Sequence, residues 1–291
     1  MARFSCRVHP IERRPSGDPD IMRALQPKVV DAVWTAVKPL LPPPDRSHPL
    51  GCHRPRVADR LCFWGILIRL VTGASWVDIE AILDHQVSDT TLRARRDEWI
   101  AAGVFDQLVA EVRAAFDRII GLDLSDVSID GSLHKAPYGG EGTGPNPTDR
   151  AKLGWNWSVA SERGGIPIGW AIDGANRNDI RLLEPTLDAV AANGLLVDIE
   201  TLHLDRGYDY PVVRARLGEL GLHDLSIQRR GTKLAGKKQP VRLGLRWIVE
   251  ATNSWWSNYG QLRHRHAALC LATTVLIVGR LIDYRDRWGT T

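Results

Sequence analysis

The sequence has few cysteines, and none of them lies in a paired C-x-x-C spacing. They are scattered along the 291 residues, at Cys6, Cys52, Cys62 and Cys270. This pattern indicates neither a disulfide framework nor a zinc ribbon. A zinc site that combined Cys6 and His9 with Cys52 and His53 would need an adjacent Cys and His to reach one tetrahedral ion, which is rare. We therefore expect reduced thiols in a cytosolic protein.

No apolar run in the sequence is long enough to predict a membrane span. The longest, Ala267 to Val278, falls short of the ~20 residues that a span needs, and two threonines interrupt it. The N-terminus lacks the apolar segment of a signal peptide. We predict a buried helix over about Ala267 to Tyr284 and no membrane association.

Charge of one sign is not in large excess either. The net charge is +4 and the isoelectric point is about 9.0, which fits a polyanionic partner without requiring one. Hydrophobic residues make up 44% of the chain and charged residues 25%, so we expect an ordinary globular core. The length suffices for one large domain or two of common size.

The pattern of the sequence divides the chain into three parts. Residues 1–26 hold Arg, Pro and Gly without periodicity, and we expect a flexible N-terminal arm. Residues 27–122 show the apolar spacing of helices. Within them, a short helix after Ser75 and a second helix capped by Ser88 predict a helix-turn-helix-like DNA-binding domain. Residues 123–291 form the third part.

Three arginines lie in the first turns of the second helix of this pair, at Arg93, Arg95 and Arg96. On a recognition helix they would contact DNA. A cluster of charges on a helix is more often a solvated face. The pattern alone leaves both interpretations open.

From residue 123 the apolar spacing becomes that of strands. Strands are predicted over Val127–Ile129, Leu153–Ala160, Ile166–Ile172, Ile199–Leu204 and Leu225–Gln228. Helices are predicted over Ile180–Ala192, Pro211–Leu220, Leu243–Trp256 and Ala267–Tyr284. The order β-β-β-α-β-α-β-α predicts a mixed α/β sheet with helices on both faces, which is the order of the ribonuclease-H-like fold. The segment Tyr138 to Pro147, rich in Gly and Pro, is predicted to be a loop.

Three carboxylates in this third part are candidates for one site. Asp130 and Asp205 each follow an apolar strand and come just before a glycine turn, and Glu250 lies in an apolar helical segment. In this strand order the first and fourth strands are adjacent, so both aspartates should reach one cleft. Carboxylates beside apolar runs need compensation, and an all-oxygen set suits Mg²⁺ or Mn²⁺. Asp173 and Asp209 are rivals, which we rank lower because Asp173 ends the third strand.

Four segments carry motifs that can be compared with known families. They are Ser128-Ile129-Asp130-Gly131-Ser132, Gly174-Ala175-Asn176-Arg177-Asn178-Asp179, Leu204-Asp205-Arg206-Gly207-Tyr208-Asp209 and Arg246-Trp247-Ile248-Val249-Glu250. Leu40-Leu41-Pro42 and Thr72-Gly73-Ala74-Ser75-Trp76 extend the match to the N-terminal part. In these motifs the chain resembles the bacterial insertion-sequence DDE transposases, in the insertion-sequence-five group.

The resemblance implies that Asp130, Asp205 and Glu250 form a catalytic triad that holds two Mg²⁺ or Mn²⁺ ions. It implies a DNA transposase that cuts at the ends of an insertion sequence and joins the freed 3′-hydroxyls to target DNA. The implied partner is double-stranded DNA, as terminal inverted repeats and target, bound by a homodimer in the bacterial cytoplasm at the nucleoid. A ribonuclease-H-like nuclease without strand transfer is an alternative, as is a domesticated DNA-binding protein with vestigial catalysis.

Further residues are candidates for DNA contacts. Arg246 matches the arginine of an Arg-x-x-x-Glu signature and shares a helix face with Glu250. The sequence departs from that signature at Leu243 and Ser257, where tyrosine and lysine are usual, and Arg263 or Arg265 could supply the missing cation. A basic loop before the Glu250 helix could follow the DNA backbone, with Arg229, Arg230, Lys233, Lys237 and Lys238.

Two aromatic residues complete the candidates. Trp255 could stack on an unpaired base, with core packing as the alternative. Tyr208 is a weaker candidate for a phosphate contact. Both lie close in sequence to the carboxylates of the candidate triad.

Overall fold

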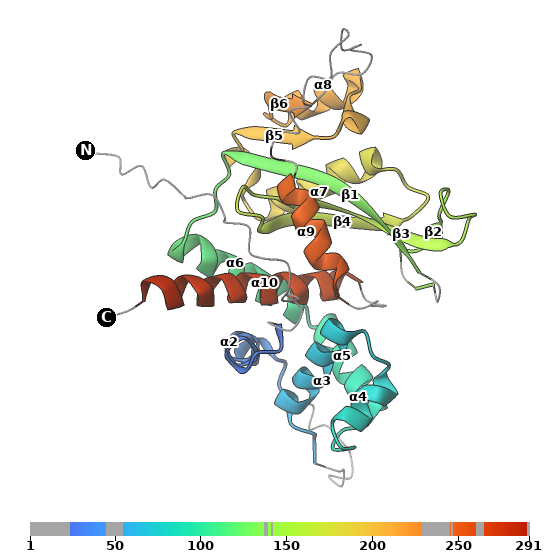
Figure 1. Ribbon diagram of the computed structural model, residues 1–291, viewed down its shortest axis with the longest axis vertical. Coiled ribbons are helices and arrows are strands. Elements are labelled where there is room, and N and C mark those ends of the chain that lie inside the picture. Colours follow the sequence, from blue (N-terminus) through green and yellow to red (C-terminus); the bar gives the residue numbers. More distant parts are fainter. Residues whose placement is uncertain are drawn as a thin grey trace.

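The structure is a computed structural model that describes residues 24–44, 55–136, 139–140, 142–227, 245, 247–259 and 265–289. Within these ranges a group of N-terminal helices is followed by a mixed sheet with helices on both faces (Figure 1). The last helix returns from the sheet to lie beside the N-terminal helices. This is the predicted α/β architecture, with a helical part before it.

The N-terminal part consists of helices whose ends the sequence explains. In the described ranges these are α2 (Pro27–Val37), the 3₁₀ turn η1 (Lys38–Leu40), α3 (Asp59–Thr72), α4 (Trp76–Ile82), α5 (Asp89–Ala101) and α6 (Val104–Ile119). Both predicted caps are confirmed, since the hydroxyl of Ser75 accepts from the Asp78 N–H at 3.1 Å and that of Ser88 from the Thr91 N–H at 3.2 Å. Helices α4 and α5 therefore form the predicted sequence of short helix, break and capped helix.

The sheet follows the predicted strand order. Its strands are β1 (Asp126–Lys135), β2 (Gly144–Pro145), β3 (Leu153–Ser161), β4 (Pro167–Gly174), β5 (Thr201–Leu204) and β6 (Asp224–Ile227). Strand β1 is central, antiparallel to β3 and parallel to β5. Strand β4 is antiparallel to β3, and β6 is parallel to β5. The first and fourth predicted strands are thus neighbours, which is the ribonuclease-H-like arrangement.

The prediction that the first strand ends at Ile129 is wrong. Strand β1 continues to Lys135 because β3 supplies a ladder of partners as far as Gly154. Only the pairing with the short strand β5 ends at Ile129, opposite Leu204. The segment predicted to be only loop also pairs with β3, through β2.

The remaining helices lie on the two faces of the sheet and at its edge. They are α7 (Asp179–Ala192), α8 (Pro211–Glu219), α9 (Trp247–Ser257) and α10 (Arg265–Trp288). Helix α7 covers the face that carries Ile129, because Leu187 belongs to the same buried cluster. Helix α9 packs on the opposite face, where the Trp157 Nε1–H donates to Asn253 Oδ1 at 2.7 Å. Figure 1 shows α9 crossing this face.

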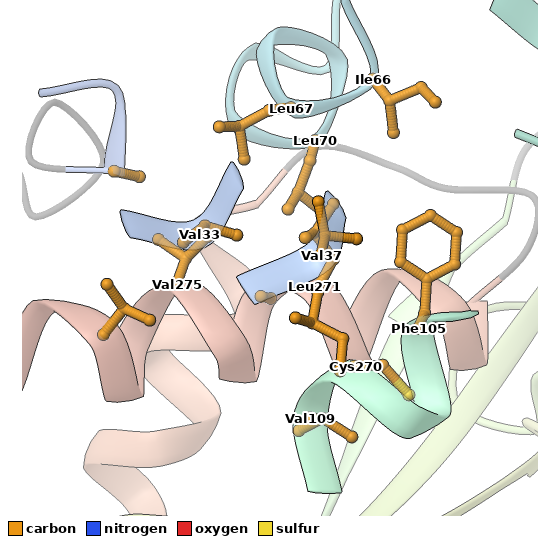
Figure 2. Close-up of a cluster of buried hydrophobic side chains, with 14 of the residues drawn as sticks. Val33, Val37, Ile66, Leu67, Leu70, Phe105, Val109, Cys270, Leu271 and Val275 are labelled. Carbon is orange, nitrogen blue, oxygen red and sulfur yellow. The ribbon is translucent and has the colours of Figure 1, made fainter. Parts of the chain in front are cut away.

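Helix α10 is a core helix, as predicted. Figure 2 shows Leu271 and Val275 of α10 among the side chains of α2, with Val33, and of α6, with Val109. By length and composition the stretch His266–Trp288 could cross a membrane, with a mean hydropathy of 1.6, but 61% of its most apolar window is buried inside the protein. The buried residues of α10, from Leu269 to Ile282, belong to the same core cluster as those of α6 and α2.

Close packing of α7 on β4 requires a glycine, which generates a test of the fold. A Cβ at Gly169 would lie 2.8 Å from the backbone nitrogen of Val190. We expect Gly169→Ala to lower the free energy of unfolding by about 2 kcal/mol through overpacking. The matched control is Gly218→Ala in α8, where a Cβ meets nothing within 4 Å and helix propensity favours alanine. Urea midpoints that are equal for the two variants would contradict the described contact.

Candidate active site

The ends of two paired strands bring Asp130 and Asp205 to one place. Ile129 pairs with Leu204 in parallel register, so Asp130 and Asp205 are the next residue of each chain segment. Both Ile129 and Leu204 are buried in the cluster under α7. Because side chains alternate along an extended chain, and Asp205 is still extended at φ −67° and ψ 157°, both aspartates point to the α9 face.

Backbone amides next to each aspartate orient the two carboxylates. Asp130 Oδ1 accepts from the N–H of Gly131 at 2.9 Å. The carboxylate of Asp205 accepts from the N–H of Arg206 and caps the 3₁₀ turn η3 (Arg206–Tyr208). Both aspartates are partly buried. They are therefore held at the rim of the sheet with access to solvent.

Helix α9 carries Glu250 over the same face. The Ser128 hydroxyl donates to the Leu245 carbonyl at 3.3 Å, and Asn253 is bonded to Trp157, whose register partner on β1 is Ser132. Thr252 of the same helix is bonded to Ser161, the register partner of Ser128. Glu250, in the first turn of α9, thus belongs to a helix that is anchored on the face of Asp130.

Glu250 itself is exposed, whereas its neighbours Ile248 and Val249 are buried. It lies three residues from the buried Asn253, so it sits at the edge of the packed face of α9 rather than on the side directed fully to solvent. The structure thus directs two partly buried aspartates and one exposed glutamate to the same side of the sheet.

A buried tyrosine near the site senses the charges of several carboxylates. Tyr208, at the end of η3, is 2% exposed. Burial raises the pKa of its hydroxyl well above the ordinary value, and the negative charges of Asp179, Asp130 and Asp205 raise this pKa further. All three carboxylates therefore act on one buried hydroxyl. Tyr208 is too deeply buried for the phosphate contact that its sequence position suggested, and that interpretation is wrong.

The two rival aspartates lie elsewhere. Asp173 pairs in register with Asn156, which pairs in turn with Leu133 of β1. Leu133 and Asp130 are an odd number of residues apart, so Asp173 faces the side of the sheet opposite to Asp130. Asp209 is engaged by Arg214, whose Nε donates to it at 2.8 Å. Asp173 thus does not share the face of Asp130, and Asp209 is held in an ion pair with Arg214.

The donor set at the Asp130 face fits a hard divalent cation in its chemistry, since it consists of the carboxylate oxygens of Asp130, Asp205 and Glu250. Among the described residues, the one group of three ligand atoms within 4.8 Å of one another is a different one, Asp106, His266 and Cys270. The triad does not form such a tight group. A site for two ions about 4 Å apart spreads its ligands between them and does not require one.

The Asp106 group is explained by hydrogen bonds instead of a metal. The Trp170 Nε1–H donates to His266 Nδ1 at 3.2 Å, so His266 Nε2 carries the proton and donates to Asp106 at 2.6 Å. Burial also raises the pKa of the Cys270 thiol well above its ordinary value, which disfavours the thiolate that a metal needs.

Comparison with known proteins identifies the family. The model of the "Transposase DDE domain" family matches residues 121–278, more than half of the chain. The chain belongs to this family. A second model, "Putative transposase of IS4/5 family", matches residues 29–109. The expected kinship with insertion-sequence DDE transposases is confirmed.

Individual relatives agree with the family. The "Putative transposase for insertion sequence element IS402" of Burkholderia cepacia is 34% identical over 133 residues, which are 44% of this chain and 61% of that protein. The match therefore spans less than two thirds of this relative. The "Insertion element IS402 uncharacterized 16.2 kDa protein" of the same organism is 37% identical over 126 residues, 42% of this chain and 82% of that protein.

One solved structure is also similar. It is the "Mos1 transposase paired-end complex with left transposon end", at 13% identity and a TM-score of 0.26. The similarity covers 79% of this chain and 82% of that one.

Among the residues predicted to contact DNA, Arg95 requires a correction. It is 5% exposed, forms an ion pair with Asp59, and its Nε lies 3.3 Å from Glu98. Its guanidinium also donates to the Val57 carbonyl at 3.3 Å. Arg95 therefore ties α5 to the start of α3 and does not face DNA.

The other two arginines of α5 remain at the surface to different degrees. Arg93 is exposed and pairs with Asp89 one turn earlier. Arg96 is partly buried, bonded to Asp97 at 2.8 Å and stacked over the Trp76 ring of α4 at 5.1 Å. Arg93 is thus the arginine of the three that is most accessible to a partner.

Trp255 is accounted for by packing. Its ring lies 3.2 Å from where a Cβ of Gly165 would be, and the Arg280 guanidinium lies 5.0 Å from the ring centre. The prediction that Trp255 stacks on a base is not supported by this packed position. Its neighbour Trp256 is in the core, edge-on to Trp157 and Trp170.

Several predicted residues lie outside the described part of the chain. They are Arg229, Arg230, Lys233, Lys237, Lys238, Arg246 and Arg263, and of Arg265 only the backbone is described. The residues of the disfavoured zinc site also lie outside the described ranges. They are Cys6, His9, Cys52 and His53. Their roles stay predictions.

The burial of Arg95 generates a prediction about stability. Arg56 also pairs with Asp59 and Glu98 but is more exposed than Arg95. Arg95→Ala removes the buried one of the two cations and the packing of its side chain, so we expect a loss of about 2 kcal/mol in the free energy of unfolding. Arg93→Ala is the matched control, because an exposed pair one helical turn apart contributes roughly 0.5 kcal/mol or less. Chemical denaturation of both variants measures the difference. Equal midpoints would show that the Arg95 ion pairs do not hold α5 on α3.

Proposed function

We propose that the chain is a metal-dependent DNA transposase of an insertion sequence, which cuts DNA at the ends of its element and joins the freed 3′-hydroxyls to target DNA. The observation that carries the proposal is the shared orientation of Asp130 and Asp205, which follow paired positions of parallel strands and point to the face under α9. Glu250 of α9 completes the set on that face.

The three carboxylates would act as the metal ligands of the reaction. Divalent-metal dependence is general among DDE transposase domains, the family to which residues 121–278 belong. The choice of Mg²⁺ or Mn²⁺, and the number of two ions, are part of our proposal. Bound there, the ions would activate a water or 3′-hydroxyl and neutralise charge on the transferred phosphoryl group.

The protein groups around the triad would orient it. The amides of Gly131 and Arg206 orient the carboxylates of Asp130 and of Asp205, which would present them as metal ligands. The Ser128 hydroxyl donates to the carbonyl of Leu245, two residues before α9 begins. This bond would help to position Glu250 relative to β1. Arg246, outside the described residues, would hold a phosphate beside the ions.

DNA binding would be shared between two parts of the chain. In this proposal, residues 27–122 form a helical DNA-binding domain, with Arg93 of α5 as its accessible arginine, and residues 123–291 form the catalytic domain. The basic loop with Arg229, Arg230, Lys233, Lys237 and Lys238 would follow the phosphate backbone. We propose double-stranded DNA, as terminal inverted repeats and target, for the partner. A homodimer on DNA and a cytoplasmic, nucleoid-associated location belong to the same proposal.

Replacing the triad is the direct test. We expect Asp130→Asn, Asp205→Asn and Glu250→Gln each to reduce cleavage of a labelled duplex carrying the element end by about a hundredfold or more, because each removes a ligand charge that stabilises the transition state. Binding of the same duplex, measured by gel shift, should persist. The control is Asp173→Asn, on the opposite face of the sheet, which should cut like the wild type.

Two results would count against this assignment. If Asp173→Asn abolished cleavage and Asp130→Asn did not, the active site would lie on the α7 face of the sheet and not on the α9 face. If the wild type bound the duplex and never cut it, the protein would be a DNA-binding protein with vestigial catalysis. Cleavage without joined products on target DNA would instead identify a nuclease.

Removal of the metal gives a second prediction. In EDTA we expect no cleavage, and Mg²⁺ or Mn²⁺ should restore it, while Ca²⁺ should support binding better than cleavage because its larger, more flexible coordination misplaces the reacting oxygens. Product formation at a series of metal concentrations measures this. Full cleavage in EDTA would exclude the metal-dependent mechanism.

A further inference from the structure

A fourth carboxylate lies directly beneath the candidate triad. Asp179 is the first residue of α7, on the face of the sheet opposite to α9. A Cβ built on Gly131 would lie 2.2 Å from Asp179 Oδ1, so the carboxylate rests against the Cα of the residue that follows Asp130. Only a glycine at position 131 permits this approach. The motif that contains Asp179 was visible in the sequence, but nothing in its spacing tied it to Asp130.

Asp179 is held in this position by a buried amide. The Asn156 Nδ2–H donates to Asp179 Oδ1 at 2.8 Å and to the Arg177 carbonyl at 3.3 Å. Asn156 is 1% exposed, and β3 carries it opposite Leu133 of β1. A buried side chain on the central part of the sheet thus fixes the direction of the Asp179 carboxylate.

A buried hydroxyl senses the same carboxylates. Tyr208 is 2% exposed. The charges of Asp179, Asp130 and Asp205 all raise the pKa of its hydroxyl, with Asp179 having the largest effect of the three, while a hydrogen bond with Ser158 lowers this pKa. The charge of Asp179 therefore reaches the same buried group as the charges of the two aspartates of the triad.

We propose that Asp179 is a positioning residue of the active site, which strengthens the binding of a divalent cation by Asp130 and Asp205 through its negative charge beneath Gly131. This inference rests on the proposed function. Asp179 acts through its neighbours: it faces the side of β1 opposite to the cation, and its oxygen Oδ1 is committed to Asn156. A carboxylate next to the ligands of a metal typically changes metal affinity about 10- to 100-fold.

The test measures metal binding by the full chain without DNA. Free Mn²⁺ is followed by electron paramagnetic resonance during titration of the wild type, Asp179→Asn, Asp173→Asn and Asp130→Asn. Asp179→Asn keeps an oxygen for Asn156 and removes only the charge. Asp173→Asn removes the same charge on the Asp179 side of the sheet, two strands from β1, and is the matched control. Thermal unfolding of each variant verifies the fold.

We expect Asp179→Asn to raise the dissociation constant for Mn²⁺ about tenfold, with Asp173→Asn within twofold of the wild type. Cleavage by Asp179→Asn should need correspondingly more Mn²⁺ and recover at saturating Mn²⁺. A dissociation constant equal to that of the wild type overturns the inference, and so does a loss of cleavage that no Mn²⁺ concentration restores, because a merely structural residue behaves in that way.

Asp130→Asn separates this inference from the proposed function. If Asp130→Asn weakens Mn²⁺ binding and Asp179→Asn does not, the triad stands and the inference fails. If Asp130→Asn leaves Mn²⁺ binding unchanged, the proposed metal site itself is wrong, and the role of Asp179 falls with it.

Discussion

The parallel pairing of β1 with β5, and the point at which it stops, is the constraint on which the candidate active site depends. The ladder ends with Ile129 opposite Leu204, both buried under α7. Burial of these two side chains fixes the register, because a slip by one residue would turn every side chain of β5 to the other face. The next residues, Asp130 and Asp205, are therefore forced to the same side. The apolar core determines where the two charges lie.

The α9 face is organised by a few buried polar contacts in an apolar setting. The bonds from Trp157 to Asn253 and from Ser161 to Thr252 are both fully buried, and such bonds specify one arrangement because an unmade one is costly. A helix held only by apolar contacts could slide along the sheet at little cost. These polar contacts instead fix the rotation and height of α9, and with them the position of Glu250.

Much of the fold could be predicted from the sequence, because local patterns report local physics. The caps at Ser75 and Ser88, the strand order and the burial of α10 follow from hydrogen-bonding groups and apolar spacing. The extent of β1 beyond Ile129 could not, because its later residues are held by a partner strand rather than by their own apolar pattern. For the same reason Arg95 looked like a surface charge: its partner Asp59 is far away in sequence. Asp179 needed the structure, since only the close approach at Gly131 relates it to Asp130.

The packing of α10 has a consequence for how the chain is made. The apolar faces of α2 and α6 are completed by Leu271 and Val275, which are synthesised long after both of these helices (Figure 2). Domains ordinarily fold in turn as they leave the ribosome. Here α2 and α6 cannot finish burying their apolar faces until α10 has been synthesised. The core around them therefore closes only in a chain that already carries Asp130, Asp205 and Glu250 of the catalytic face.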